Sequence, residues 1–421
     1  MKYAVVTFGC RVNQADSLAI EDGLRARGGV AVPPEEAELV VVNTCSVTAS
    51  ADQAARQTIR RVARVNPDVR VVVTGCYATR RPSELAALPG VVRVVPNDAK
   101  EALVDAAAGD LGLTTAERFA GGDGACGGTL EPGVAGRTAL TLRVQTGCEE
   151  RCSYCIIPST RGASRSRPPA QVLADVERAV AAGYKEMAIT GVHLGSYGRD
   201  LGDGSSLATL LAALAAVDAD VLFRISSFEP MDCTPEVVDL VASSPRLAPH
   251  FHLPLQHGAD DVLRAMRRPY TVSYYRDLIE RIRRARPHAA IGSDIIVGFP
   301  GETPDHFDQM RRVLEALPLT HLHVFPYSDR PGTDASWRHP KVDGRDIRER
   351  AREIRAIGER LAARFRASQV GRTLRALTVD DGRSAVTGNY LKVRLSEGRG
   401  RNEWVQIAVR GGEPLVGDLS P

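Results

Sequence analysis

Short runs of β-branched residues alternate with helical patterns along most of this chain, and few folds other than parallel α/β folds accommodate that alternation. In the first part of the chain the strand-like runs lie at 2–8, 38–43 and 69–75, and helical patterns lie between them near 15–27 and 50–65. Strands buried on both faces of a parallel sheet have this apolar character. The sequence therefore predicts an N-terminal parallel α/β domain.

A second and longer alternation occupies the middle of the chain. Its strand-like runs lie at 139–145, 186–192, 221–227, 250–256, 290–299 and 321–327. The helical patterns between them lie near 169–182, 206–217, 234–243, 259–285 and 303–316, and we expect the fourth to break at Pro269. Six such β/α units predict a partial (β/α)6 barrel resembling a TIM barrel.

The remaining segments divide the chain. A Gly-rich stretch without periodicity predicts a linker at 113–133, between an N-terminal domain (1–112) and the central barrel (134–366). A mixed-charge segment at 344–369 predicts one long helix, for which a solvated face is favoured over a nucleic-acid surface. Short strand-like runs then predict a small antiparallel β-barrel at 367–421, a kind that often binds single-stranded nucleic acid.

Composition limits the class of protein. Charged residues make up 25% of the 421 residues, as in ordinary globular proteins, and no apolar run reaches the roughly 18 residues of a membrane span. Because the start also lacks a signal peptide's apolar region, we expect a cytoplasmic protein with no membrane partner. The net charge of +3 is compatible with nucleic acid without indicating it.

Three of the eight cysteines form the motif C-x-x-x-C-x-x-C at Cys148, Cys152 and Cys155. The motif follows the first strand of the predicted barrel, at the end where barrel enzymes carry their chemistry. Three thiolates on one loop can bind a cubane iron-sulfur cluster and leave one iron open to a substrate. A zinc knuckle or buried thiols are alternatives, but no fourth Cys or His lies at zinc-finger spacing.

Cys10, Cys45 and Cys76 each follow one of the first three predicted strands. Parallel strands bring their carboxyl ends to one edge of the sheet, so these thiols can form a second three-cysteine cluster site. The alternative is that buried cysteines happen to end three apolar strands. Cys126 and Cys233 lie at no ligand spacing, and we expect them to be free thiols without a role.

The segment CEERCSYC, with Tyr154 before the last cysteine, resembles the signature of the radical S-adenosylmethionine superfamily. Together with the N-terminal cysteines and the terminal barrel, it resembles the methylthiotransferase family over essentially the whole chain. In that family the terminal barrel is the TRAM domain, an RNA-binding module. The resemblance implies two [4Fe-4S] clusters and two molecules of S-adenosylmethionine per turnover, one as radical source and one as methyl donor.

Within the family, the segments GCRVNQADS, NTCSVTASAD, TGVHLGSYG, ISSFEP and HLPLQHGADDVLRAMRRPYT resemble the branch that modifies threonylcarbamoyladenosine in tRNA. The ribosomal-protein branch typically has Pro-Lys, and the isopentenyladenosine branch Gln-Met, where this chain has Arg11 and Val12.

The resemblance implies transfer of a methylthio group to C2 of threonylcarbamoyladenosine 37. A 5′-deoxyadenosyl radical would take the C2 hydrogen, and no catalytic side chain is implied beyond the cluster ligands. It also implies the tRNA anticodon loop as partner, a one-electron reductant such as flavodoxin or ferredoxin, and a sulfur donor. Isopentenyladenosine 37 and a ribosomal-protein aspartate remain alternative targets. An RNA-binding protein with non-catalytic clusters is an alternative of a different class.

Further residues are implied less directly. Contacts to S-adenosylmethionine are implied for Tyr154, Thr190, Gly191, Ser226, Ser227, Gln256 and Gly298. Capping or satisfied polar groups of the barrel are the alternative for most of them, and a simple turn for Gly298. A basic loop follows the cysteine motif, and it suits either phosphate contacts or an ordinary solvated loop; its arginines are Arg161, Arg165 and Arg167. A strand of the terminal barrel suits either RNA stacking and phosphate contacts or half-buried strand packing; its residues are Tyr390, Lys392 and Arg394.

Overall fold

The structure is a computed structural model that describes residues 1–110, 132 and 138–420. Apart from residue 132, the predicted linker at 113–133 lies outside the described residues, as does Cys126. In the part of the chain that the structure describes, none of the helices has the length and apolar character needed to cross a membrane.

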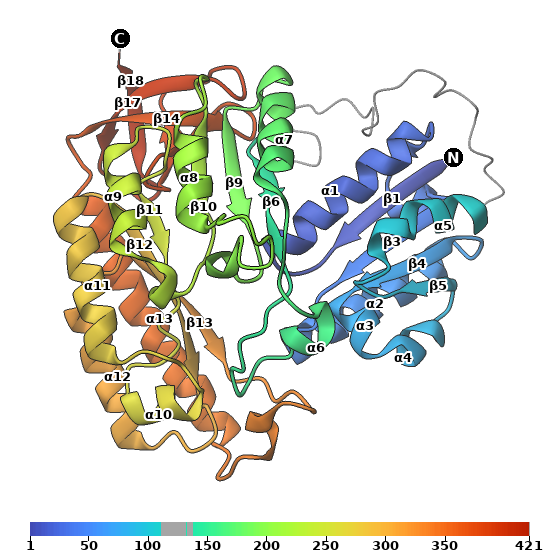
Figure 1. Ribbon diagram of the computed structural model, residues 1–421, viewed down its shortest axis with the longest axis horizontal. Coiled ribbons are helices and arrows are strands. Elements are labelled where there is room, and N and C mark those ends of the chain that lie inside the picture. The colour runs from blue at the N-terminus through green and yellow to red at the C-terminus, as the bar shows by residue number, and fades with distance from the viewer. Residues whose placement is uncertain (111–131, 133–137, 421) are drawn as a thin grey trace.

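The N-terminal unit is a five-stranded parallel sheet with the order β2-β1-β3-β4-β5, as predicted in type (Figure 1). Its strands are β1 (Lys2–Thr7), β2 (Val30–Ala31), β3 (Leu39–Thr44), β4 (Arg70–Gly75) and β5 (Val91–Val95). Its helices are α1 (Arg11–Ala26), α2 (Ala49–Val65), α3 (Cys76–Arg80), α4 (Pro82–Ala86) and α5 (Leu103–Asp110).

Helices cover both faces of this sheet. On one face Ile59 of α2 packs with Val40 and Val71, and on the other Leu24 of α1 packs with Val41. Every residue of β3 is buried, which explains its continuous apolar run. Helix α1 starts at Arg11 rather than near 15, because Cys10 already occupies its N-cap position.

The core contains six parallel strands in two three-stranded sheets, β10-β9-β6 and β11-β12-β13. The strands are β6 (Leu140–Arg143), β9 (Glu186–Thr190), β10 (Leu222–Ile225), β11 (His250–His252), β12 (Ala290–Val297) and β13 (His321–Pro326). An isolated parallel bridge connects Phe223 of β10 with Leu247, which lies just before β11. Among the described residues β6 and β13 do not pair, so the barrel is partial, as predicted.

Helices connect the core strands as expected. They are α7 (Pro169–Ala181), α8 (Leu207–Ala215), α9 (Pro235–Ser243), α10 (Asp260–Ala265), α11 (Val272–Ala285) and α12 (Pro304–Ala316). The predicted break at Pro269 lies between α10 and α11. A two-stranded ribbon of β7 (Gln145–Thr146) and β8 (Arg165–Ser166) and the short helix α6 (Ile157–Arg161) follow β6.

The predicted long helix is α13 (Gly344–Ala367), and it is not solvated all round. Ile354 and Leu361 on one side are buried, and the helix packs against β13. Five strands then close into a small barrel: β14 (Thr373–Val379), β15 (Ser384–Thr387), β16 (Lys392–Leu395), β17 (Trp404–Arg410) and β18 (Val416–Ser420).

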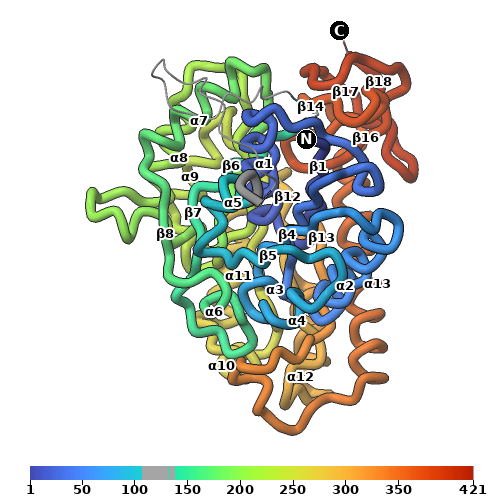
Figure 2. The backbone as a smooth tube through the Cα atoms, turned by 90° about the vertical axis from the view of Figure 1, so that its right-hand side faces the viewer, coloured from blue at the N-terminus to red at the C-terminus, as the bar shows by residue number. Residues whose placement is uncertain are grey.

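The prediction that this barrel is wholly antiparallel is wrong for one pair, because β16 and β18 are parallel. Strand β18 was not predicted, since its sequence VGDLS lacks the alternation of a half-buried strand. In Figure 1 the N-terminal unit (blue) lies beside the core (green to orange) and the terminal barrel (red) lies at the top. Figure 2 shows the same three parts with the N-terminal sheet toward the viewer.

Candidate functional site

Three cysteines lie at one edge of the N-terminal sheet. Cys45 and Cys76 directly follow β3 and β4, and Cys10 lies shortly after the end of β1. These three strands are neighbours in the sheet, and the three residues are called here the edge cysteines. Cys10 is the N-cap of α1 and Cys76 is the first residue of α3. The parallel sheet thus delivers three thiols to its carboxyl edge, where α/β sheets bind ligands.

Glycines allow the backbone to come close at this edge. Gly9 has a φ of +90°, and a Cβ there would lie 2.6 Å from the Sγ of Cys45. Gly75 has a φ of +99°, and a Cβ there would lie 2.2 Å from the carbonyl oxygen of Thr44. Only glycine fits such positions without displacing the chain. Burial raises the pKa of the Cys45 thiol to about 12, and the neighbouring edge cysteines add to this rise.

The other three cysteines, Cys148, Cys152 and Cys155, lie on the loop between β7 and α6 and are called here the loop cysteines. The loop is fixed to α10 by Ser153, whose N–H donates to Met266 O at 3.1 Å and whose Oγ donates to Ala265 O at 2.9 Å. All three thiols are free of disulfides.

Hydrogen-bond donors surround the loop cysteines. The Ile157 N–H donates to Cys155 Sγ at 3.5 Å, and the Arg268 guanidinium donates to Cys152 Sγ at 3.0 Å. His193 lies within hydrogen-bond reach of Cys148, and its Nε2 is 2.9 Å from an Asp232 oxygen. Three thiols with N–H donors directed at their sulfurs are a donor set that fits an iron-sulfur cluster, since such bonds stabilise sulfur's negative charge.

The two cysteine sets are connected. Helix α3, which begins at Cys76, packs against α6, which follows Cys155. The Asn97 side chain donates to Cys76 Sγ at 3.7 Å and to the carbonyl oxygen of Thr160 at 2.9 Å. The edge of the N-terminal sheet therefore faces the cysteine loop of the core.

A cavity of about 1040 Å³ lies where the N-terminal unit, the core and the terminal barrel meet. Cys10 and Cys45 line it, as do the predicted residues Thr190, Gly191, Ser226 and Ser227. This volume is at the upper end of the range for small-molecule sites. Cys76 and the loop cysteines lie outside its lining, although His193, the partner of Cys148, is part of the wall.

Three predicted cofactor contacts do not line this cavity. Tyr154 packs beside Met266 and Phe299, and Gln256, with a φ of 68°, donates its N–H to Asp294 O at 2.9 Å. Gly298 has a φ of +78°, and a Cβ there would lie 2.3 Å from Cγ1 of Ile347. The turn and the close approach of α13 account for this glycine.

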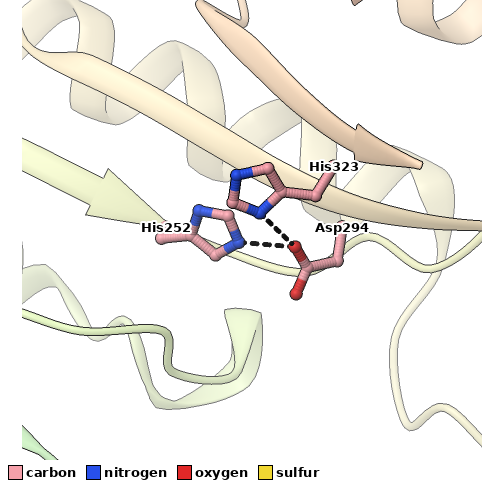
Figure 3. Close-up of side chains that lie close together, drawn as sticks. All are labelled: His252, Asp294 and His323. Atoms are coloured by element: carbon pink, nitrogen blue, oxygen red, sulfur yellow. Dashed lines mark hydrogen bonds and ion pairs between the residues drawn. The ribbon is translucent and has the colours of Figure 1, made fainter. Parts of the chain in front are cut away.

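Sequence reasoning missed a cluster of histidines in the same cavity (Figure 3). His252 Nε2 and His323 Nδ1 lie 2.7 Å and 3.1 Å from Oδ1 of Asp294, which comes from the strand between theirs. The three groups are close enough together to share a metal ion. His250 and His321 flank them, and burial lowers the pKa of His321 to about 3. The repeated H-x-H pattern at 250–252 and 321–323 was the signal available in the sequence.

The three arginines of the predicted basic loop lie in different environments. Arg161 is buried, donates to Asn13 Oδ1 at 2.5 Å and pairs with Asp16 at 3.3 Å, so it is neither a phosphate contact nor part of a solvated loop. Arg167 pairs with Asp175 at 2.5 Å, and only Arg165 is exposed.

The predicted aromatic and basic strand in the terminal barrel needs a similar correction. Tyr390 is not on a strand: it has a φ of 64° and lies in the turn before β16. Its ring faces the cavity, 4.9 Å from the His250 ring. Lys392 and Arg394 are both exposed, while Val393 between them is buried, so these two share the outer face of β16.

The two halves of this arrangement match separate family models. Residues 2–96 match the uncharacterized protein family UPF0004, and residues 142–314 match the radical SAM superfamily. The chain is 35% identical to the threonylcarbamoyladenosine tRNA methylthiotransferase MtaB of Bacillus subtilis, over 98% of this chain and 91% of that protein. This chain belongs to the MtaB-type family of methylthiotransferases.

The family has relatives with another target. The tRNA-2-methylthio-N(6)-dimethylallyladenosine synthase of Frankia alni is also 35% identical, over 94% of this chain and 81% of that protein. Among solved structures, the radical S-adenosylmethionine methyltransferase TsrM from Kitasatospora setae matches with a TM-score of 0.57 and 18% identity, covering 80% of this chain and 74% of that one. At that identity the likeness shows the fold alone.

Proposed function

We propose that this chain is a tRNA-modifying enzyme that adds a methylthio group to C2 of N6-threonylcarbamoyladenosine at position 37, by radical S-adenosylmethionine chemistry. One observation carries the proposal. Two sets of three cysteines lie where the N-terminal unit meets the core, and Cys10 and Cys45 of one set line a cavity of about 1040 Å³, which is large enough for small-molecule reactants. The substrate is inferred from the names of the MtaB relatives.

The donor sets suit two [4Fe-4S] clusters. Bound to the loop cysteines, one cluster would supply the electron that cleaves S-adenosylmethionine, and a second on the edge cysteines would supply the sulfur for transfer. The proposed reaction needs two molecules of S-adenosylmethionine per turnover, one as radical source and one as methyl donor. It also needs a one-electron reductant, such as flavodoxin or ferredoxin, and a sulfur donor.

Residues of this chain would hold the reactants and their surroundings. Thr190, Gly191, Ser226 and Ser227 are proposed to contact S-adenosylmethionine, because all four line the cavity at the ends of β9 and β10. The Gln145 side chain orients the segment after β9 by accepting the N–H groups of Val192 and His193, each at 2.9 Å.

Polar side chains would stabilise the sulfur ligands. The Arg268 guanidinium donates to Cys152 Sγ at 3.0 Å and would offset negative charge on that sulfur when a cluster is bound. His193 is held by Asp232 and carries a proton toward Cys148, since these hydrogen bonds raise its pKa to about 9 although burial opposes its charge. Both side chains are buried, so water is excluded from one side of the cysteine loop.

The terminal barrel is proposed to be a TRAM domain that binds tRNA near the anticodon loop. Lys392 and Arg394 present two cations on the outer face of β16, and Tyr390 presents a ring at the cavity mouth. Because tRNA is the proposed substrate, the protein is proposed to act in the cytoplasm. The alternative targets are an isopentenyl-modified adenosine 37, as in the relative from Frankia alni, and a ribosomal-protein aspartate.

The experiment is a reaction of the purified, cluster-reconstituted protein with S-adenosylmethionine, a reductant and tRNA. Two tRNA samples are compared, one carrying threonylcarbamoyladenosine 37 and one carrying isopentenyladenosine 37. Mass spectrometry of the digested nucleosides should detect the 2-methylthio product from the first sample only. A product from the second sample alone would overturn the proposed substrate, and no 5′-deoxyadenosine from either would overturn the enzyme class.

A further inference from the structure

One cationic side chain of the cavity has no acidic partner among the described residues. Its lining contains four arginine or lysine side chains, and three of them are paired with acids outside the lining. Arg161 pairs with Asp16 at 3.3 Å, Arg366 with Glu413 at 2.6 Å, and Lys392 with Asp380 at 2.7 Å. The fourth is Arg11, for which the described residues supply no acidic partner.

The acids of the lining are already engaged. Asp294 accepts from His252 and His323 (Figure 3), and Glu229 is in contact with the Arg268 guanidinium. No other aspartate or glutamate lines the cavity among the described residues. The cavity therefore contains one positive charge that no acid of the described residues balances.

Two neutral groups fix Arg11 in place. Its Nη1 donates to Ser226 Oγ at 3.2 Å, and its Nη2 donates to the Tyr390 hydroxyl at 3.0 Å. The Tyr390 ring is itself supported by Arg224, whose guanidinium carbon lies 4.6 Å from the ring centroid. Arg224 is buried against Glu186 and donates to Gly388 O at 2.7 Å. Arg11 thus bridges the N-terminal unit, the core and the terminal barrel.

The remaining donors of Arg11 suit a planar anion. A guanidinium has five N–H groups in a fixed fork, and the two bonds above use two of them. A fork of this kind pairs with a carboxylate through two parallel hydrogen bonds. Arg11 lines the same cavity as Cys10 and Cys45, so a group that it binds lies in the cavity that these two edge cysteines line.

We propose that Arg11 binds the carboxylate of the threonyl group of the substrate nucleoside and thereby selects threonylcarbamoyladenosine over isopentenyladenosine. This inference rests on the proposed function. The threonylcarbamoyl group ends in a carboxylate, whereas an isopentenyl group is uncharged and apolar. An isopentenyl group in this position would bury the Arg11 charge without a partner, which disfavours that substrate.

Carboxylate chemistry has a second source in the same reaction, because S-adenosylmethionine carries one in its methionine part. A phosphate of the tRNA backbone is a third possible anion. These sources differ in a measurable way, because a change of the group at position 37 removes the threonyl carboxylate and leaves S-adenosylmethionine and the backbone phosphates unchanged. The experiment therefore compares anticodon stem-loop RNAs that are identical except at position 37.

The reconstituted holoenzyme is titrated with stem-loops carrying threonylcarbamoyladenosine, its neutral carboxamide analogue, or adenosine. The wild type should prefer the carboxylate-bearing RNA by roughly 10- to 100-fold, the range of a charge-assisted hydrogen-bonded pair. Arg11→Gln should bring the ratio of the affinities for the carboxylate-bearing RNA and the adenosine RNA close to one. Arg11→Lys should retain part of the preference. Arg360→Gln, which removes an exposed arginine of α13 paired with Glu315, is the matched control and should behave as the wild type.

Other outcomes would overturn the inference. An equal loss of affinity for all three RNAs would assign Arg11 to a phosphate, and a raised KM for S-adenosylmethionine without RNA would assign it to the methionine carboxylate. Unchanged preference in Arg11→Gln would exclude the threonyl carboxylate. The preference is a binding measurement, so a wild type that shows it without forming product would contradict the proposed function and not this inference.

Discussion

Replacing Asp16 by asparagine should loosen the contact between the N-terminal unit and the core. The Asp16 side chain is 1% exposed and is in contact with Lys100 of its own unit and with Arg143 and Arg161 of the core. Burial by itself would raise the pKa of this carboxyl, but the three cations lower it below its usual value. Asp16 is therefore charged at neutral pH, and its neutral substitute would leave buried cations without an anion.

The size of the effect follows from burial. Removing one partner of a buried ion pair costs about 3 to 5 kcal/mol, because the remaining charge stays desolvated. With a urea dependence of about 2 kcal/mol per molar for a unit of this size, the unfolding midpoint should fall by roughly 1.5 to 2.5 M. The second substitution in Asp16→Asn/Lys100→Met should recover part of this loss, because it removes one of the stranded cations.

The assay is urea unfolding of the full chain, followed by limited proteolysis that reports the N-terminal unit separately from the core. Asp105→Asn is the control, because Asp105 is 68% exposed and its pair with Arg27 lies at the surface. Surface pairs are worth about 0 to 1 kcal/mol. If Asp16→Asn and Asp105→Asn shift the midpoint equally, the buried network does not stabilise the contact between the N-terminal unit and the core.

Three further results are expected. Cys76→Ala should abolish the methylthio product while 5′-deoxyadenosine still forms, whereas Cys148→Ala should abolish both products. Equal loss of both products in the two variants would contradict separate tasks for the edge cysteines and the loop cysteines. Gly9→Ala forces a Cβ against Cys45 at a positive φ and should cost about 1 to 3 kcal/mol, with iron lost from the N-terminal set in elemental analysis. Burial by itself would raise the pKa of the Glu302 carboxyl, but His257 and Arg350 together lower it below the usual 4.5. The stability that the charged carboxylate adds is therefore lost as the pH falls below about 4.5. Glu302→Gln should weaken the acid dependence of unfolding in that range, and an unchanged profile would argue against its ionic role.

Local patterns were sufficient to predict the main strands and helices of the N-terminal sheet and of the core, but not the shorter elements such as β2, β5 and β18. The β3 run LVVVNT is apolar because both faces are covered, and the break between α10 and α11 follows from Pro269. The edge cysteines could be placed together because each follows a strand and parallel strands share a carboxyl edge. These inferences depend on contacts between neighbours in sequence or in sheet order.

Contacts between distant segments could not be predicted in this way. Arg11 and Tyr390 are hydrogen-bonded although 379 positions separate them, and no periodicity in the chain records that contact. From the sequence Arg161 suits either a phosphate contact or an ordinary solvated loop, yet its side chain is buried against Asp16 of the N-terminal unit. The histidine cluster depends on the register of β11, β12 and β13, which pairs His323 with Asp294 and His252 with Gly292, two residues before Asp294 on the same face of β12.

The central claim is that this chain methylthiolates threonylcarbamoyladenosine 37. The most direct test is mass spectrometry of nucleosides from tRNA of a strain that lacks the gene, with and without the gene restored. We expect that 2-methylthio-threonylcarbamoyladenosine disappears on deletion and returns with the gene. If it is unchanged while 2-methylthio-isopentenyladenosine is lost, the family stands and the proposed substrate is wrong.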